Sequence, residues 1–409
     1  MVWKRSLFAL LAGFVLGGPV AAGVLEGNCR VADQPAATLL IPYFEVDLDN
    51  PGGLSTLISV NNASAKPALA RLVMWTDWGI PTLAFDIYLT GYDVQTLNLR
   101  DLLQGRLPVT GSGVSNRGLL SETGTDFPGC AATLSSSKTL DAPSLAYLRA
   151  AHTGQPVAPA TTGTAALCIG GRHARPGLAA GYVTIDSVNR CSPTTVGMTD
   201  NTPAQSTYFA KGGTGLASNA NVLWGDFFYL DPQTHHAASN TAVHVVADTD
   251  FFAAGDYTFY GRYHGFDSRD DRAPLSSLYY ARYLDGGAFS GGTDLVVWRD
   301  NRSNKVEPAG CSTGPAWAPL GELQMVAFDE EENPVEIRQS NAFPLAAQKV
   351  HVGEPPLVPA DRFGWLMMDL WHRDATHAQG WVGVMMSSEG RYSVSHDAIR
   401  ADDLCNFGL

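Results

Sequence analysis

The feature that most constrains this chain is a two-residue alternation between Leu83 and Thr90. The more apolar side of this segment would carry Leu83, Phe85, Ile87 and Leu89, and the other side Ala84, Asp86, Tyr88 and Thr90. A period of two is typical of a β-strand, because successive side chains point to opposite faces. The pattern therefore predicts a strand with one buried face and one solvent-facing face.

Similar short segments flank this strand. Residues 56–60, 68–75 and 94–99 are rich in apolar and β-branched residues, and the gaps between them hold turn formers such as Pro67, Gly79 and Gly91. No helical pattern separates them. Four short strands at this spacing predict an antiparallel β-sandwich.

The rest of the chain predicts more strands around a long insert. Residues 104–178 are rich in Gly, Ser, Thr and Pro, with one helix expected at 142–151 and a stop at Gly154. Strands are expected at 181–186, 221–231, 241–247 and 257–263 because these segments are rich in β-branched and aromatic residues. A helix that begins near Pro274 and ends at Gly286 would connect two halves.

Landmarks of the first half recur in order from Thr293 onward. Residues 57–60 match 295–298, 74–77 with Pro81 match 327–329 with Pro334, 181–186 match 364–369, and 224–225 match 382–383. The first copy is longer between its proline and the next aromatic residue by about the length of the insert. Two related sandwiches in tandem would explain this. The alternative is chance, since turn chemistry places aromatic, Asp and Pro residues in any two strand-turn-strand units.

These observations predict an all-β fold of two tandem immunoglobulin-like antiparallel β-sandwiches. We expect a signal peptide at 1–22, a first domain at 23–270 with the insert at about 104–178, a helical connector at 271–290 and a second domain at 291–409. A length of 409 residues exceeds what one hydrophobic core usually serves.

The N-terminus predicts export. Lys4 and Arg5 precede an apolar run at 7–16, and small residues at 20–22 form a cleavage site, so Gly23 would begin the mature chain. The formal net charge is −13, and cleavage would remove Lys4 and Arg5, which leaves −13 − 2 = −15 for the mature chain. A chain this acidic, without a basic run, lacks the electrostatic footprint of a nucleic-acid or anionic-membrane partner. We expect a secreted or periplasmic protein with no membrane insertion of the mature chain.

Six cysteines in an exported chain indicate disulfides. The preferred pair is Cys130 with Cys168, because both lie in the insert. No C-x-x-C occurs, so a zinc ribbon or a thioredoxin-type redox site has no support.

Several polar clusters in the sequence are candidate sites. His372, Asp374 and His377 could meet as metal ligands if a strand continued from 370 to 374. The sequence favours a solvated polar loop instead, because no fourth ligand is identifiable. The charged loop 264–272 is explained by internal salt bridges at the surface. Asp47, Asp49 and Asn50 faintly resemble a calcium loop but lack its closing glutamate. His235 and His236 would point to opposite sides of an extended chain.

Motifs for nucleophilic catalysis are absent or fragmentary. The segment 113–117 lacks the final glycine of a nucleophile elbow. Ser135 to Lys138 match the S-x-x-K motif of penicillin-binding enzymes, and Lys211 to Gly213 loosely match their Lys-Thr-Gly strand. We interpret this match as coincidence, because the surrounding serines and threonines are poor helix formers, whereas that nucleophile opens a helix. Aromatic runs at 224–229 and 365–371 are candidates for sugar or polymer platforms, but aromatics with alternate polar neighbours more often belong to the core and the sheet surface. No catalytic, cofactor-binding or metal-binding residue is predicted, and no cofactor is expected.

The segments Gly181 to Cys191, Asn221 to Pro232 and Gly292 to Arg299 resemble those of uncharacterised exported bacterial proteins. The resemblance implies export and a β-rich fold, and it implies no activity, cofactor or functional residue. We expect a binding or structural protein with an unknown protein or carbohydrate partner, its contact surface formed by the insert and the sandwich-end loops. The alternative is a secreted hydrolase of carbohydrate or a similar polymer, with paired carboxylates hidden among the acidic residues.

Overall fold

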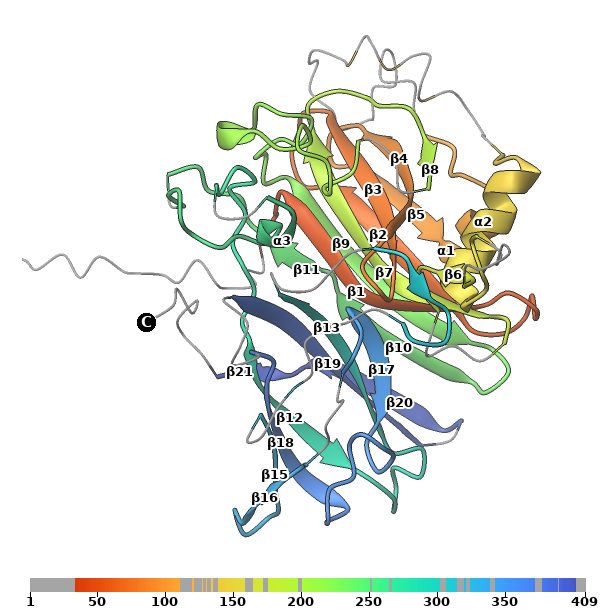
Figure 1. Ribbon diagram of the computed structural model, residues 1–409, viewed down its shortest axis with the longest axis vertical. Coiled ribbons are helices and arrows are strands. Elements are labelled where there is room, and N and C mark those ends of the chain that lie inside the picture. The colour runs from red at the N-terminus through yellow and green to blue at the C-terminus, as the bar shows by residue number, and fades with distance from the viewer. Residues whose placement is uncertain are drawn as a thin grey trace, which may run out of the picture.

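The computed structural model describes residues 34–110, 120, 127, 130, 134, 139–158, 165–171, 176–197, 201–250, 252–264, 267–301, 307–314, 320, 324–338, 343–371, 377–388 and 390–401. The protein is mostly β, with 46% strand and 8% helix in several antiparallel sheets, which confirms the all-β prediction (Figure 1). The expected leader, Cys29 and Cys405 lie outside the described residues.

The first half of the chain, from β1 to β11, contains two sheets (Figure 1). One has the order β11-β1-β7-β3-β4-β8 and the other the order β10-β9-β2-β5. The strands are β1 (Thr38–Asp47), β2 (Ser55–Asn62), β3 (Ala68–Thr76), β4 (Pro81–Leu89), β5 (Val94–Asn98), β7 (Leu178–Val188), β8 (Thr195–Val196), β9 (Leu223–Asp231), β10 (His236–Thr241) and β11 (Val243–Val245). The two sheets touch where the Tyr229 hydroxyl donates to the Tyr43 carbonyl at 2.8 Å.

The second half, from β12 to β21, also contains two sheets. Their orders are β16-β15-β18-β12-β21 and β17-β13-β19-β20. The strands are β12 (Leu278–Leu284), β13 (Thr293–Asn301), β15 (Met325–Phe328), β16 (Pro334–Glu336), β17 (Ala347–His351), β18 (Phe363–Asp369), β19 (Ala378–Ser388), β20 (Tyr392–Asp397) and β21 (Ile399–Arg400).

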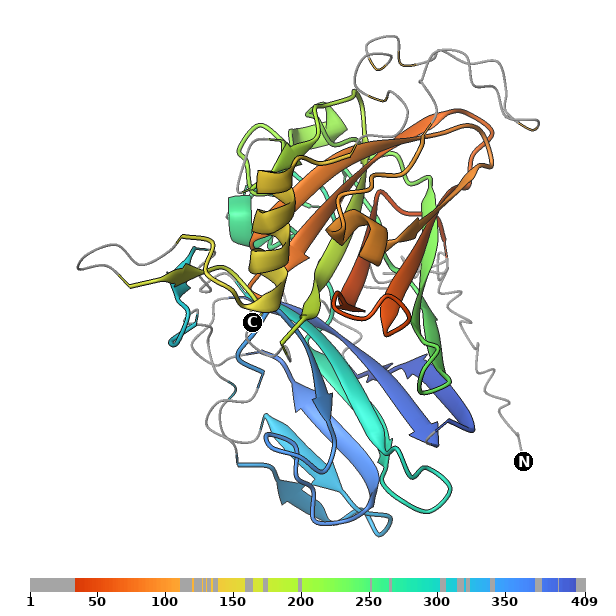
Figure 2. The same cartoon turned by 90° about the vertical axis from the view of Figure 1, so that its right-hand side faces the viewer.

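The remaining elements are short, apart from one helix in the insert. They are α1 (Leu99–Leu103), α2 (Ala142–Thr153), the 3-10 turn η2 (Lys211–Gly213), α3 (Gly261–His264) and the strand pair β6 (Leu167–Cys168) and β14 (Ala309–Gly310). The predicted helix in the insert is confirmed as α2, which lies alongside the first-half sheet (Figure 2). Asp141 caps its start by accepting from Ser144 N–H at 2.9 Å, and Gly154 ends it in the left-handed conformation.

The two halves repeat one strand topology. The orders β11-β1-β7-β3-β4 and β21-β12-β18-β15-β16 match strand for strand, as do β10-β9-β2-β5 and β20-β19-β13-β17, and the matched strands follow one another in the same chain order. Each landmark pair expected from the sequence falls on matched strands. One alignment is wrong by two residues, because Gly225 faces Val60 whereas Gly383 faces Val296 rather than Trp298.

The β3–β4 and β15–β16 turns show the repetition at the level of single bonds. Trp75 faces Pro81 across its hairpin as Phe328 faces Pro334. The Thr76 hydroxyl accepts from two backbone N–H groups of its turn, and the Asp329 carboxylate accepts from the two matching N–H groups at 2.9 and 2.8 Å. Side chains that satisfy turn amides explain why these landmarks recur.

The strand next to each turn carries a glycine for a steric reason. A Cβ on Gly181 would lie 2.0 Å from the Trp75 carbonyl oxygen, and a Cβ on Gly364 would lie 2.1 Å from that of Phe328. Any larger residue would force the strands apart, so both halves require glycine here.

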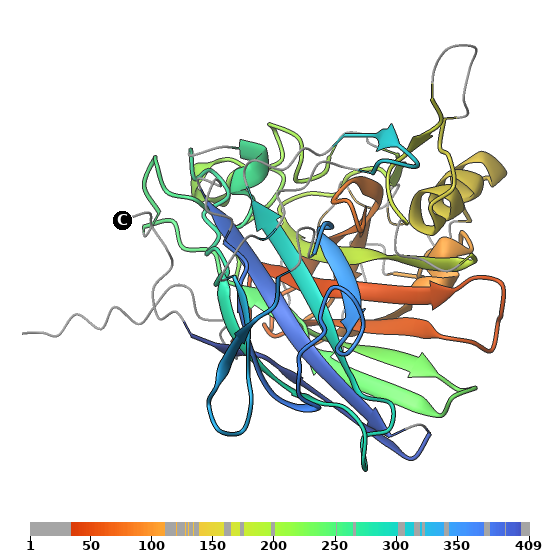
Figure 3. The same cartoon turned by 60° about the horizontal axis from the view of Figure 1, so that its bottom comes forward.

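One continuous cluster of buried apolar side chains runs through both halves. At the seam between them, β10 lies beside β20 (Figure 3). The Ser395 hydroxyl hydrogen-bonds to the Ser239 backbone there. Trp298 of β13 stacks on Phe259 with ring centres 5.4 Å apart. The packing therefore ties the halves to each other.

The prediction that one face of residues 83–90 is wet is wrong, because β4 is buried along its whole length. Asp86, on the supposed wet face, pairs with Arg71 at 2.6 Å. Arg71 also donates to the carbonyls of Asn201 and Pro193, which belong to a covering segment. Alternating polarity does not distinguish solvent from a buried, fully bonded polar layer.

Three other expectations need correction. Residues 257–263 do not form a strand but end in helix α3, where Gly261 packs closely against the Tyr257 ring. The connecting helix from Pro274 is wrong, because its main part is strand β12, with buried residues at every second position. Residues 241–247 are not one strand, since the chain leaves β10 at Thr241 and joins the other sheet as β11.

The preferred disulfide is also wrong. Cys130 pairs with Cys191, and Cys168 pairs with Cys311. The second bond joins the insert to the second half, beside the β6–β14 strand pair. Spacing along the chain could not reveal this, because 143 residues separate the two cysteines.

Candidate functional site

A groove of about 650 Å³ at the seam between the halves is lined by charged and titratable side chains from both halves. Its charged or titratable lining includes Glu45, Asp231, His236, Asp294, Lys349 and His351. The first three come from the first half and the last three from the second. Only tertiary packing brings them together.

Glu45 of β1 is the centre of the groove's hydrogen bonding. Its carboxylate accepts from the Tyr43 hydroxyl at 2.7 Å and from Lys349 Nζ of β17 at 2.7 Å. Burial, followed by the Glu45 charge, raises the pKa of Tyr43 well above its usual value. Tyr43 is therefore a neutral donor, and the ion pair holds one half to the other.

His351 and Asp294 form a second charged pair. They lie directly opposite each other on β17 and β13, and His351 Nδ1 is 2.8 Å from the carboxylate. The hydrogen bond to Asp294 raises the pKa of His351, and partial burial opposes it. Both side chains are about one-third exposed, so a ligand in the groove can reach them.

His236 and Asp231 complete the first-half wall. They face each other across the β9–β10 hairpin. Burial, followed by the charge of Lys349, lowers the pKa of His236, so this histidine is neutral at pH 7. Asp231 has no ion-pair partner among the described residues, and its bond to Gln233 N–H at 3.0 Å leaves lone pairs for a ligand.

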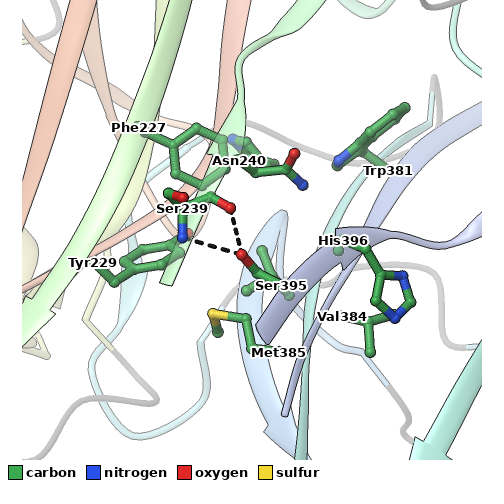
Figure 4. A pocket seen from close by; sticks show the side chains of 12 residues that line it. Phe227, Tyr229, Ser239, Asn240, Trp381, Val384, Met385, Ser395 and His396 are labelled. Atoms are coloured by element: carbon green, nitrogen blue, oxygen red, sulfur yellow. Dashed lines mark hydrogen bonds between the residues drawn. The ribbon is translucent and has the colours of Figure 1, made fainter. Parts of the chain in front are cut away.

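A small apolar cavity adjoins the groove, and Tyr229 and Met385 line both (Figure 4). Its volume of about 20 Å³ holds no more than about one water. Figure 4 shows Ser395 pointing at Ser239 beside it, where the two halves are hydrogen-bonded. The cavity is a packing gap at the seam rather than a ligand site.

The groove lacks a recognisable catalytic set. Among the described residues, no serine hydroxyl or thiol is hydrogen-bonded to His351, and no cluster of three or more His, Cys, Asp and Glu side chains can hold a metal ion. Two of its carboxylates already hold a cationic partner. The arrangement can bind a polar ligand but offers no assembled nucleophile and base.

The metal candidate from the sequence cannot be assembled from the described part of the chain. His372 and Asp374 lie outside it, and β18 ends at Asp369. His377 is described, and its ring stacks on Tyr257 at 5.2 Å. The Trp371 ring lies edge-on to it at 6.1 Å, so His377 packs between aromatic rings.

The calcium-like loop holds a guanidinium rather than a free set of oxygens. Arg100 donates to the backbone carbonyls of Asp47 and Asn50, and also to those of Gly53 and Leu54 at 2.9 and 2.8 Å. Asp49 pairs with Arg149 of α2. These carbonyls therefore already have a cation.

The charged loop at 264–272 is only partly a surface feature, contrary to the expectation. Asp267 and Arg269 pair near the surface, but Asp270, Asp271 and Arg272 are fully buried. Arg272 reaches Asp186 of β7, where the pKa of Asp186 is raised by burial while the arginine opposes the shift. Three contiguous charges on a loop predict solvent exposure from sequence, and only the tertiary structure shows that other segments cover them.

The remaining sequence candidates either have structural contacts or lie outside the described residues. Residues 113–117 and 135–138 are not described, and Lys211 pairs with Asp271. In the first aromatic run Phe227 and Tyr229 belong to the core. In the second run Trp365 lies on the outer face of β18.

The groove as a whole was not predictable from sequence, because its lining residues are scattered from Tyr43 to Gly390. Local signals were the adjacent pair His235 and His236 and the aromatic run 224–229, which contains Tyr229. No family model matches this chain, and no match is found among curated proteins or solved structures. The described helices are all too short or too polar to cross a bilayer.

Proposed function

We propose that this is an exported protein of two tandem immunoglobulin-like β-sandwiches, secreted or periplasmic, that binds a ligand in the seam groove. The shared strand topology supports the tandem arrangement, and the two disulfide pairs suit an oxidising compartment. The insert and the sandwich-end loops would add contact surface.

The convergence of charged groups from both halves on one groove carries this proposal. Lys349 and His351 are held in place by Glu45 and Asp294 before any ligand arrives, so little ordering is left to oppose binding. Asp231 remains without a cationic partner among the described residues. The ligand would therefore be a small polar molecule whose amino or hydroxyl groups donate to these oxygens.

A panel of amino acids, polyamines and oligosaccharides tests the proposal, with thermal shift as the readout and calorimetry for each hit. A ligand of the groove should raise Tm. The Asp231→Asn variant should bind this ligand about tenfold more weakly, since a hydrogen bond to a charged group contributes about 1.5–3 kcal/mol. Asp250→Asn, in an exposed loop, is the matched control. Hits that respond equally to both variants would refute the groove as the site.

The alternative function is a secreted hydrolase, and the His351–Asp294 pair is the observation that favours it. A histidine oriented by a carboxylate is one part of an acid–base pair. A screen of glycoside, ester and peptide substrates should then show turnover that His351→Ala abolishes. Turnover of this kind would replace the binding proposal.

A further inference from the structure

The outer face of the β15–β18–β12 sheet in the second half forms a second groove, of about 690 Å³. Aromatic rings of Tyr280, Phe328 and Trp365 line it, and Phe363 at its edge is 44% exposed. The turn 329–332 adds a rim of carboxylates. Exposed apolar surface rimmed by polar residues is typical of protein–protein and ligand-binding sites.

The repeated topology shows what covers the matching face of the first half. Tyr182 matches Trp365, since each follows the close-packed glycine, and Trp75 matches Phe328. In the first half Trp75 stacks on Tyr182 at 5.6 Å, and Tyr263 of α3 stacks on Trp75 at 5.6 Å. The first-half aromatic pair is thus capped by a segment of the chain itself.

That capping segment also brings an arginine to the turn. The Tyr263 hydroxyl donates to the Gly79 carbonyl at 3.3 Å, and Arg262 Nη2 lies 2.8 Å from where a Cβ on Gly79 would stand. Arg262 lies over the Tyr263 ring and pairs with Asp300 at 2.9 Å. The cap is therefore an aromatic ring with an adjacent guanidinium.

The second-half turn is complementary to such a cap in charge. Glu332 stands where the first half has Gly79, and Glu330 and Glu331 are exposed beside it. Arg282 lies over the Trp365 ring at 4.6 Å, so the chain's own guanidinium already covers one face of this ring, and the Phe328 ring and Glu332 are left to receive the cap. Within the described part of the chain, no segment stacks on Phe328 as Tyr263 stacks on Trp75.

We infer that this outer face is a docking site for a partner protein's segment that carries an arginine next to an aromatic residue. The segment would sit on Phe328 and Trp365 as Tyr263 sits on Trp75, with its guanidinium at Glu332. The site is separate from the seam groove and does not depend on ligand binding there.

The test uses the protein's own capping sequence, a synthetic peptide YTFYGRYH that copies residues 257–264. Titration of this peptide into the purified protein, with calorimetry as the readout, should show saturable binding. Glu332→Arg should weaken binding by about tenfold, and a peptide with glutamate in place of its arginine should lose a similar amount. Glu332→Arg should bind this reversed-charge peptide better than the wild-type protein does. Tyr392→Ala, an exposed aromatic on the other sheet, should leave binding unchanged.

The outcomes separate the possible occupants. Trp365→Ala should abolish binding, with circular dichroism to verify the fold, and the charge-swapped pair keeps the test valid if that variant unfolds. No saturation up to about 1 mM peptide would refute the proposal. Oligosaccharide binding that Trp365→Ala removes, or a dimer that the same change dissociates, would refute it in favour of a sugar or of a second copy.

Discussion

Replacement of Arg272 by methionine should reveal how strongly a buried charge depends on its partner. The guanidinium is fully buried, donates to the carbonyls of Asp270 and Ser218 at 2.7 and 3.0 Å, and lies 3.6 Å from the Asp186 carboxylate. Methionine preserves much of the packing over the Phe209 ring but leaves Asp186 as an uncompensated charge. We expect Arg272→Met to lower the free energy of unfolding by about 3–5 kcal/mol.

Urea unfolding at two pH values distinguishes charge from packing. Burial raises the pKa of Asp186, and loss of Arg272 should raise it further. Because the folded pKa then exceeds the unfolded value, the destabilisation should grow as pH rises from about 5 to about 8. Adding Asp186→Asn removes the orphaned charge and should recover at least about 1 kcal/mol.

Arg106→Met is the matched surface control. Arg106 pairs with Asp101, but both side chains are about half exposed, so the change should cost less than about 1 kcal/mol. Equal losses for Arg272→Met and for the double variant, with no dependence on pH, would show that Arg272 acts through packing alone.

Gly181→Ala and Gly364→Ala should each cost about 1–3 kcal/mol in thermal or urea unfolding, whereas Gly383→Ala, whose Cβ would meet nothing nearer than 3.8 Å, should cost less; equal losses at all three would contradict the steric reading. Asp294→Asn should lower the pKa of His351 in an NMR titration. The stability due to this pair, at most about 1 kcal/mol, should be present at acidic pH and lost as pH rises through the folded pKa of His351; an unchanged titration would show that Asp294 does not act on it. Mass spectrometry of unreduced peptides should find Cys168 linked to Cys311, and replacing both by serine should cost about 2–5 kcal/mol; a Cys130–Cys168 peptide would refute the pairing.

Features that depend on neighbouring residues were predictable. The strand content, helix α2 and the aromatic-to-proline turns follow from alternation, capping and turn chemistry, which act over a few residues. The landmarks around Gly181 and Gly364 were also visible, because the same close strand contact selects glycine in both halves. The prediction of a helix at β12 was wrong because Leu278, Tyr279 and Arg282 happen to fit a helical spacing, whereas the burial of the segment follows a period of two.

Features that depend on distant segments were not predictable. Both faces of β4 are buried because residues near Pro193 and Asn201 cover it, and nothing in the strand itself records that cover. The seam groove joins Glu45 to Lys349, which are 304 positions apart. No local pattern encodes a pairing over such a separation.

The sequence by itself determined that this chain forms antiparallel sheets with one arrangement of strands and turns used twice, because backbone hydrogen bonding and turn geometry are local requirements. Only the tertiary structure decided which of the equivalent surfaces in the two halves are covered by other segments. In the first half α3 covers the aromatic pair of Trp75 and Tyr182, whereas Trp365 in the second half keeps a groove beside it. Burial is a property of the whole chain, since any segment long enough to reach a face can remove it from water.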